Sequence, residues 1–174
     1  MPREQYDNWS RGRRMAFLIN AYNAFTVKLV TENYPLDSIK EIGGVFGSPW
    51  AQAFIPLFGQ TLTLNQIEHS MIREPGVFDE SRIHFAVNCA SIGCPALRSE
   101  AYVASELDAQ LQDSQRRFLS DRSRNRFDAA AGHFRVSKIV DWDADDFANQ
   151  SGSLQAYLQR QTTLLAAAEH LEQA

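Results

Sequence analysis

Both cysteines of the chain lie in the stretch IHFAVNCASIGCPAL, which runs from Ile83 to Leu97 and also contains His84. Cys94 precedes Pro95, and proline favours the first turn of a helix. The unpaired amides and the dipole at a helix N-terminus stabilise a thiolate, which is the nucleophilic form of cysteine. An imidazole beside such a thiol supplies the general base that a cysteine nucleophile needs. This pattern predicts a cysteine-dependent hydrolase or acyl transferase, with Cys94 as the nucleophile and His84 as the general base and acid.

A carboxylate would complete this site by orienting the imidazole, and Glu68 lies on the helix predicted to precede it. Adjacent helical residues diverge by about 100°, so we expect that Glu68 and His69 do not both face one point of the site. We assign the orienting role to Glu68. The side chain of Asn88 and the backbone amides near Cys94 are candidates for binding an oxyanion. The predicted substrate is an amide, a thioester or a small peptide. The other candidate substrate-binding or supporting residues are Cys89, His69, Arg82, Asn20 and Asn23.

Three other uses of the same residues remain open. A free cysteine is often a small buried side chain, and the domain would then be a non-enzymatic binding or scaffold module. Zinc is an alternative cofactor, with Cys89, Cys94, His84 and His69 as ligands, although their spacing matches no tight zinc motif. A disulfide between Cys89 and Cys94 would silence the nucleophile or act as a redox switch. If the site is catalytic we expect no cofactor, and the acidic segment DWDADDF does not fit the register of a calcium-binding loop.

The composition predicts one domain, because 174 residues that are 44% hydrophobic can bury one sizeable core. The net charge of −4 argues against a nucleic-acid partner, whose binding surface would be basic. No apolar run is long enough to cross a bilayer, so no transmembrane segment is expected. The N-terminal residues lack the apolar core of a signal peptide. The predicted partner is a small-molecule or peptide substrate, and the composition decides neither the compartment nor the oligomeric state.

Helical and strand patterns occur without an alternating βαβ order, which predicts an α+β domain with a small, mainly antiparallel sheet covered by helices. The clearest strand pattern is SRIHFAVNC, where apolar residues alternate with His84, Ala86 and Asn88. Thr63 and Gln66 are spaced as a capping box. The other predicted elements are helices at about 13–33, from 64 to 73, from about 105 and at 153–172, a helical turn at 37–41, an acidic helix start within 141–150, and hairpins near 59–60 and near 132.

Four segments, AFLINAYNAF, LNQIEHSMIR, RIHFAVNCASIGCPALRSEAY and VSKIVDWDADDF, together resemble the domain of unknown function 547 family over roughly residues 13–147. The resemblance implies no established activity. Members occur in bacterial exported proteins, which implies a periplasmic or secreted location and an upstream leader absent from this chain. Asp143 stands where an aromatic residue is usual. The cysteine–histidine pairing is also similar in chemistry to papain-like and transglutaminase-like enzymes. The family signature falls on Asn20, Tyr22, Asn23, Ile67, Glu68, His69, Arg82, His84, Phe85, Asn88, Cys89, Cys94, Pro95, Lys138, Trp142, Asp146 and Phe147.

Overall fold

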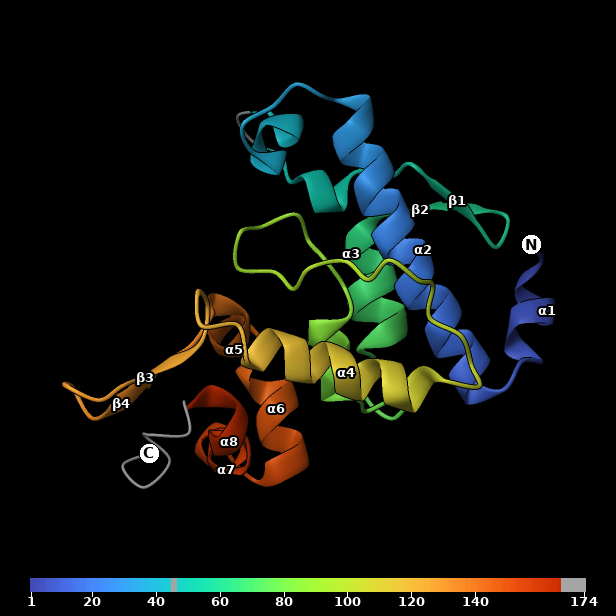
Figure 1. Ribbon diagram of the computed structural model, residues 1–174. Coiled ribbons are helices and arrows are strands. Elements are labelled where there is room, and N and C mark those ends of the chain that lie inside the picture. The colour runs from blue at the N-terminus through green and yellow to red at the C-terminus, as the bar shows by residue number, and fades with distance from the viewer. Residues whose placement is uncertain (45–46, 167–174) are drawn as a thin grey trace.

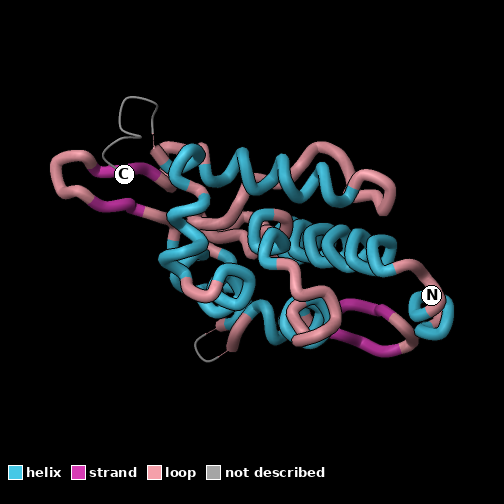
Figure 2. The backbone as a smooth tube through the Cα atoms, turned by 90° about the horizontal axis from the view of Figure 1, so that it is seen from below, coloured by secondary structure: helices cyan, strands magenta, loops and turns pink. Residues whose placement is uncertain are grey.

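A computed structural model describes residues 1–44 and 47–166 of the chain. The long helix α2 (Arg11–Glu32) is flanked by other elements of the fold, and α3 (Leu64–Ile67) packs against it. The helix α4 (Leu107–Leu119) crosses near one end of α2, and the C-terminal helices lie below it (Figure 1). Two hairpins lie at opposite ends of the molecule, as the view from below shows (Figure 2).

Local capping and turn geometry account for the elements in the first half of the chain. The Ser10 side chain accepts a hydrogen bond from the Arg13 amide and begins α2 close to its predicted start. Thr63 and Gln66 form the predicted capping box before α3. Gly59 turns the predicted hairpin at a φ of +75°, where a residue without a Cβ is favoured. The other elements of this half are α1 (Arg3–Asp7), the 3-10 helices η1 (Ile39–Gly43) and η2 (Pro49–Ala51), and the paired strands β1 (Ile55–Leu57) and β2 (Gln60–Leu62).

The second half of the chain is mainly helical, with one projecting hairpin. The antiparallel strands β3 (Arg126–Asp128) and β4 (His133–Arg135) form the hairpin predicted near residue 132. The predicted closing helix is divided into α7 (Leu154–Arg160) and α8 (Thr162–Leu165), and residues 167–172 of that prediction lie outside the described residues. The helices α5 (Lys138–Trp142) and α6 (Ala144–Ser151) precede them. The π-helix η3 (Glu68–Ile72) and the 3-10 helix η4 (Ser81–Phe85) complete the first half of the chain.

The predicted strand at residues 81–89 is wrong, because its first half forms the helix η4. The amide of Ile83 donates to the carbonyl of Glu80 at 3.2 Å, and the amide of Ala86 donates to that of Ile83 at 2.8 Å. Ile83 packs in the core around α2 and α3, whereas Phe85 packs in a second core with Phe118 of α4. Ile83 and Phe85 therefore pack in two different cores on either side of one short helix. Their alternation with polar residues gives the same sequence pattern as a strand with one buried face.

The α+β class is confirmed, with the strands of the described residues arranged as two separate two-stranded antiparallel sheets. Within residues 1–44 and 47–166, no helix is both long enough and apolar enough to cross a membrane. The position of η4 between the two cores places His84 at their junction, where the C-terminal helices meet the first half of the chain.

Candidate functional site

The two cysteines are joined to each other in this structure. Cys89 and Cys94 form a disulfide, so the described residues include no free thiol. No helix begins at Pro95, and Cys94 therefore lacks the helix N-terminus that was expected to stabilise its thiolate. The disulfide also uses two ligands of the alternative zinc set, and no group of three His, Cys, Asp or Glu residues in the described part of the chain is arranged to hold a metal ion.

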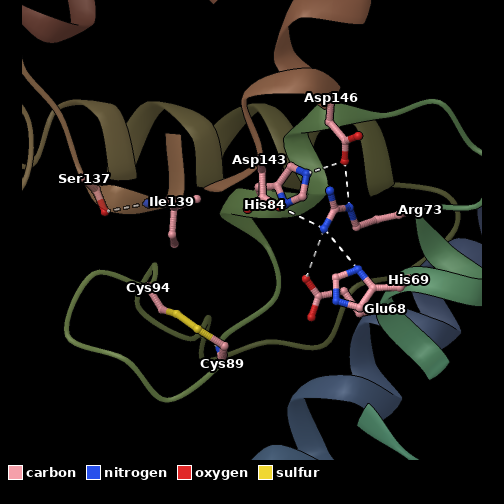
Figure 3. A network of polar contacts seen from close by, with 10 residues as sticks. All are labelled: Glu68, His69, Arg73, His84, Cys89, Cys94, Ser137, Ile139, Asp143 and Asp146. Carbon is pink, nitrogen blue, oxygen red and sulfur yellow. Dashed lines mark hydrogen bonds and ion pairs between the residues drawn. A yellow bond between two sulfur atoms is a disulfide. The ribbon is translucent and has the colours of Figure 1, made fainter. Parts of the chain in front are cut away.

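His84 is 2% exposed and lies between two carboxylates, away from the sulfur atoms. Its Nε2 is 2.8 Å from Asp146 Oδ2, and its Nδ1 is 3.2 Å from Asp143 Oδ2. Both ring nitrogens therefore face carboxylate oxygens, and each is engaged by a different aspartate. Figure 3 shows the imidazole pointing to Asp146 while the disulfide lies well apart from it. His84 therefore presents no ring nitrogen to Cys94.

Arg73 joins His84 and its carboxylates to η3. Its guanidinium lies 2.9 Å from Asp143 and 2.8 Å from Asp146, and its Nη1 lies 4.0 Å from Glu68. The same Nη1 lies 3.1 Å from Nδ1 of His69. We call Glu68, Arg73, His84, Asp143 and Asp146 the charged centre.

The π-helix explains why neighbouring residues can both reach Arg73. The Arg73 amide donates to the Glu68 carbonyl at 2.8 Å, a five-residue span that widens the turn relative to an α-helix. Glu68 is consequently on the same side as His69, and both contact the guanidinium (Figure 3). The expectation that only one of them faces the site, which assumed α-helical geometry, is wrong for these two residues. Within the described residues neither side chain is hydrogen-bonded or ion-paired to His84, and Glu68 adds a third carboxylate to the centre through Arg73.

The two aspartates that flank His84 differ in their electrostatic environment. Hydrogen bonding to His84, followed by hydrogen bonding to Arg73, outweighs burial and lowers the pKa of Asp146 to about 2. Burial raises the pKa of Asp143, although the charges of His84 and Arg73 act to lower it. Burial also opposes the charged form of Arg73, but the hydrogen bond to Asp146 and the surrounding carboxylates raise its pKa above the usual value. The centre therefore favours the charged forms of Arg73 and Asp146 and disfavours the charged form of Asp143.

Tyr22 of α2 lies fully buried next to this centre. Burial and then the charge of Glu68 raise the pKa of its phenol, so Tyr22 stays protonated at physiological pH. Its hydroxyl has no hydrogen-bond partner within the described residues.

The three asparagines expected near the site hold backbone segments in place. Asn20 accepts from the Tyr102 amide at 2.9 Å and donates to the carbonyl of the same residue at 2.8 Å. Asn23 donates to the Ala86 carbonyl at 2.8 Å and accepts from the Asn88 amide at 2.9 Å. The Asn88 side chain donates to the Pro95 carbonyl at 2.6 Å and accepts from the Ala90 amide at 2.7 Å. Each side chain uses both of its ends in the scaffold, and the Nδ2 of Asn88 is aimed at a protein carbonyl.

Arg82 is likewise engaged elsewhere. Its guanidinium forms a two-point contact with Glu80, at 2.8 and 2.7 Å, and a 2.8 Å contact with Asp108 of α4. These partners tie η4 to α4. None of them belongs to the charged centre.

A cavity of about 280 Å³ opens beside the charged centre, between residues 72–83 and α6. Arg73 and Asp146 of the charged centre are among its lining residues. Sequence reasoning missed this cavity and the pairing of Arg73 with Asp143 and Asp146. The only sequence signals were the place of Asp146 in the late family segment and the unusual acidic residue at position 143.

One comparison with known proteins found a match. The profile of the family described as "Protein of unknown function, DUF547" matches residues 6–119, which include Glu68, His84 and both cysteines but neither aspartate of the charged centre. No match was found among curated proteins or among solved structures. Because the matched residues make up more than half of the chain, the protein belongs to the DUF547 family.

Proposed function

We propose that this domain is a non-enzymatic binding module, in which the disulfide and the charged centre are structural. The observation that carries the proposal is the separation of the thiol from its expected base. The sulfur of Cys94 is bonded to Cys89, while both ring nitrogens of His84 face Asp143 and Asp146. A nucleophile without a free sulfur and a base without a free nitrogen do not form the pair that thiol catalysis needs.

The charged centre joins segments that are far apart in the chain, which supports a structural role. Arg73 follows η3, His84 lies in η4, and Asp143 and Asp146 flank and begin α6. Their contacts span up to 73 positions of sequence. Removal of one partner from a buried ion pair leaves an uncompensated charge and costs about 3–5 kcal/mol. The centre is therefore suited to holding the C-terminal helices against the part of the chain that the family profile matches.

The disulfide loop connects three further parts of the fold. Trp50 of η2 donates to the Cys89 carbonyl at 3.2 Å. Ser137, which caps α5, donates to the Gly93 carbonyl at 2.9 Å. Arg124 donates to the Ile92 carbonyl at 3.2 Å. A cross-link within a loop that carries these contacts supports a domain that works where disulfides persist, outside a reducing cytosol.

The competing hypothesis of a cysteine hydrolase makes a prediction about the reduced protein. If Cys94 were a nucleophile held in reserve by the disulfide, reduction would create a hydrolytic activity that depends on Cys94. We expect reduced wild type and Cys94→Ser to hydrolyse p-nitrophenyl acetate at the same rate. A burst of nitrophenol from the reduced wild type that is absent from Cys94→Ser, and also from His84→Gln, would overturn the proposal.

A further inference from the structure

We infer that the cavity beside the charged centre binds a small ligand with a cationic amine and a short alkyl chain. The inference rests on the proposed binding function and names the ligand class for it. The cavity, at about 280 Å³, is at the small end of ligand pockets, which run from about 300 to 1,000 Å³. Its lining combines carboxylates with apolar side chains, the two groups that such a ligand needs.

The charge balance of the lining favours a cation. Three carboxylates, those of Asp79, Glu80 and Asp146, line the cavity together with one guanidinium, that of Arg73. Arg73 is already paired with Asp146 at 2.8 Å and with Asp143 at 2.9 Å. An anionic ligand would have to compete with these carboxylates for the guanidinium of Arg73. A cation meets more carboxylates than guanidinium groups, even when Arg82, the partner of Glu80, is counted.

Two of these carboxylates keep an acceptor oxygen for a ligand. Asp146 receives both Arg73 and His84 on Oδ2, and within the described residues its Oδ1 receives no hydrogen bond. Figure 3 shows that second oxygen turned away from both donors. Asp79 accepts the Gly76 amide on Oδ1 at 2.9 Å, and its Oδ2 has no donor in the described part of the chain. Glu80 is occupied by Arg82, so Asp79 and Asp146 are the two carboxylates left to pair with an ammonium group.

Apolar side chains in the lining can accommodate the carbon chain. Ile72, Pro75 and Ile83 line the cavity, and Ile72 and Ile83 are both anchored in the core. A short alkyl chain against these side chains would remove apolar surface from water, at about 25 cal/mol per Å². The expected ligand is therefore a linear alkylamine or a molecule that ends in one.

The walls of the cavity are fixed before any ligand arrives. The side chain of Gln150 on α6 accepts from the Ser81 hydroxyl at 2.8 Å and donates to the Asp79 carbonyl at 3.0 Å. These two bonds tie α6 to the segment that carries Asp79. A site that is held in shape loses little entropy on binding, which matters for a ligand of this size.

The test compares three probes of equal length and different head groups, n-butylamine, butyrate and n-butanol, by NMR titration of the full chain. The reporter is the side-chain amide of Gln150, which lines the cavity. We expect saturable shifts of this amide with n-butylamine, and no saturable shift with butyrate or n-butanol. Absence of a saturable shift with n-butylamine, or an equal response to butyrate, would overturn the inference.

A matched pair of variants assigns the binding to the cavity. Asp79→Asn removes one free carboxylate while its amide oxygen can still accept the Gly76 amide. Asp145→Asn removes the same charge from an exposed position of α6 that does not line the cavity. We expect Asp79→Asn to weaken n-butylamine binding about fivefold and Asp145→Asn to leave it unchanged. Equal effects of the two variants would show only a general influence of net charge and would contradict the assigned site.

Failure of this inference is distinguishable from failure of the proposed function. Saturable binding of n-butanol or butyrate in place of n-butylamine would refute the amine ligand and leave the binding module standing. Hydrolysis that depends on Cys94 in the reduced protein would refute the binding module, whatever the three probes do.

Discussion

Nε2 of His84 lies 2.8 Å from Oδ2 of Asp146, a residue 62 positions later in the chain. This contact links η4, within the residues matched by the family profile, to α6, beyond them. Since Arg73 bonds to the same carboxylate oxygen, the three side chains form one unit. The unit explains why a histidine that sequence reasoning assigned to catalysis is buried between acids.

Removal of the imidazole is expected to destabilise the fold strongly. His84→Ala leaves the carboxylates of Asp143 and Asp146 without the imidazole that both contact at the junction of the two cores, so we expect the free energy of unfolding to fall by about 3 kcal/mol. Urea unfolding measures this loss. His133→Ala, at an exposed position in β4, serves as the control and should change stability by less than about 0.5 kcal/mol. A loss below about 1 kcal/mol for His84→Ala would contradict a structural role of the charged centre.

Acid should weaken the fold through Asp146. Its pKa is about 2 in the folded protein, below the ordinary value of 3.8, so the unfolded state binds the proton first as the pH falls. The stabilisation is therefore complete above about pH 4 and is lost as the pH falls towards 2. We expect this contribution to be about 1 kcal/mol, because Asp146 is partly exposed.

The measurement is urea unfolding of wild type and Asp146→Asn between pH 6 and pH 2. The variant should show a shallower loss of stability in the acid range. Asp113, whose pKa is also lowered to about 2, mainly by Arg98 and Arg116, is present in both proteins and cancels in the comparison. Parallel curves for the two proteins would contradict the account. Asp143 has the opposite effect on the pH dependence of stability. Its pKa is raised, so the folded state binds the proton more readily than the unfolded state, and acid favours the fold through this residue.

Reduction of the disulfide should cost stability without abolishing the fold. The closed loop is short, and a loop of this length predicts a loss of about 2 kcal/mol when Cys89 and Cys94 are reduced. Thermal or urea unfolding with and without a phosphine reductant measures it. The double variant Cys89→Ser, Cys94→Ser should have the stability of the reduced wild type and should not respond to the reductant. A wild type that is equally stable in both conditions would argue that the cross-link does not constrain this loop.

Asn23 should contribute to stability through its two backbone contacts. Asn23→Ala leaves the Ala86 carbonyl and the Asn88 amide without their partners, so we expect a loss of about 2 kcal/mol. Asn149→Ala, at an exposed position of α6, should cost less than about 0.5 kcal/mol. Equal stabilities of the two variants by urea unfolding would show that α2 is held to residues 86–88 by packing alone.

The elements that were predicted correctly depend on residues close in sequence. The capping box of Thr63 and Gln66 spans three positions, and the hairpin near Gly132 depends on one glycine with a positive φ. The family could also be identified from local segments, and the profile match confirms it. These features are predictable because each is decided within a few residues.

The parts that were not predicted depend on distant partners or on an uncommon backbone. Arg73 is bonded to Asp146, which lies 73 positions later in the chain, and no local sequence pattern predicts such a long-range pair. The π-helix moves Glu68 beside His69 in a way that α-helical spacing excludes. The strand predicted through His84 failed because an alternating pattern cannot distinguish a strand from a short helix that packs between two cores.

The reactivity of Cys94 in protein purified without reductant is the most direct test of the central claim. Iodoacetamide labelling across pH 6–9, located by mass spectrometry and combined with a zinc assay, reports the state of both sulfurs. We expect no bound zinc and no label on Cys89 or Cys94 in the unreduced protein. After a reductant is added, both cysteines should be labelled. The contrary result would be rapid labelling of Cys94 in the unreduced protein, with a thiol pKa well below the usual value of about 8.5. It would contradict the structural role of the disulfide and support Cys94 as a nucleophile.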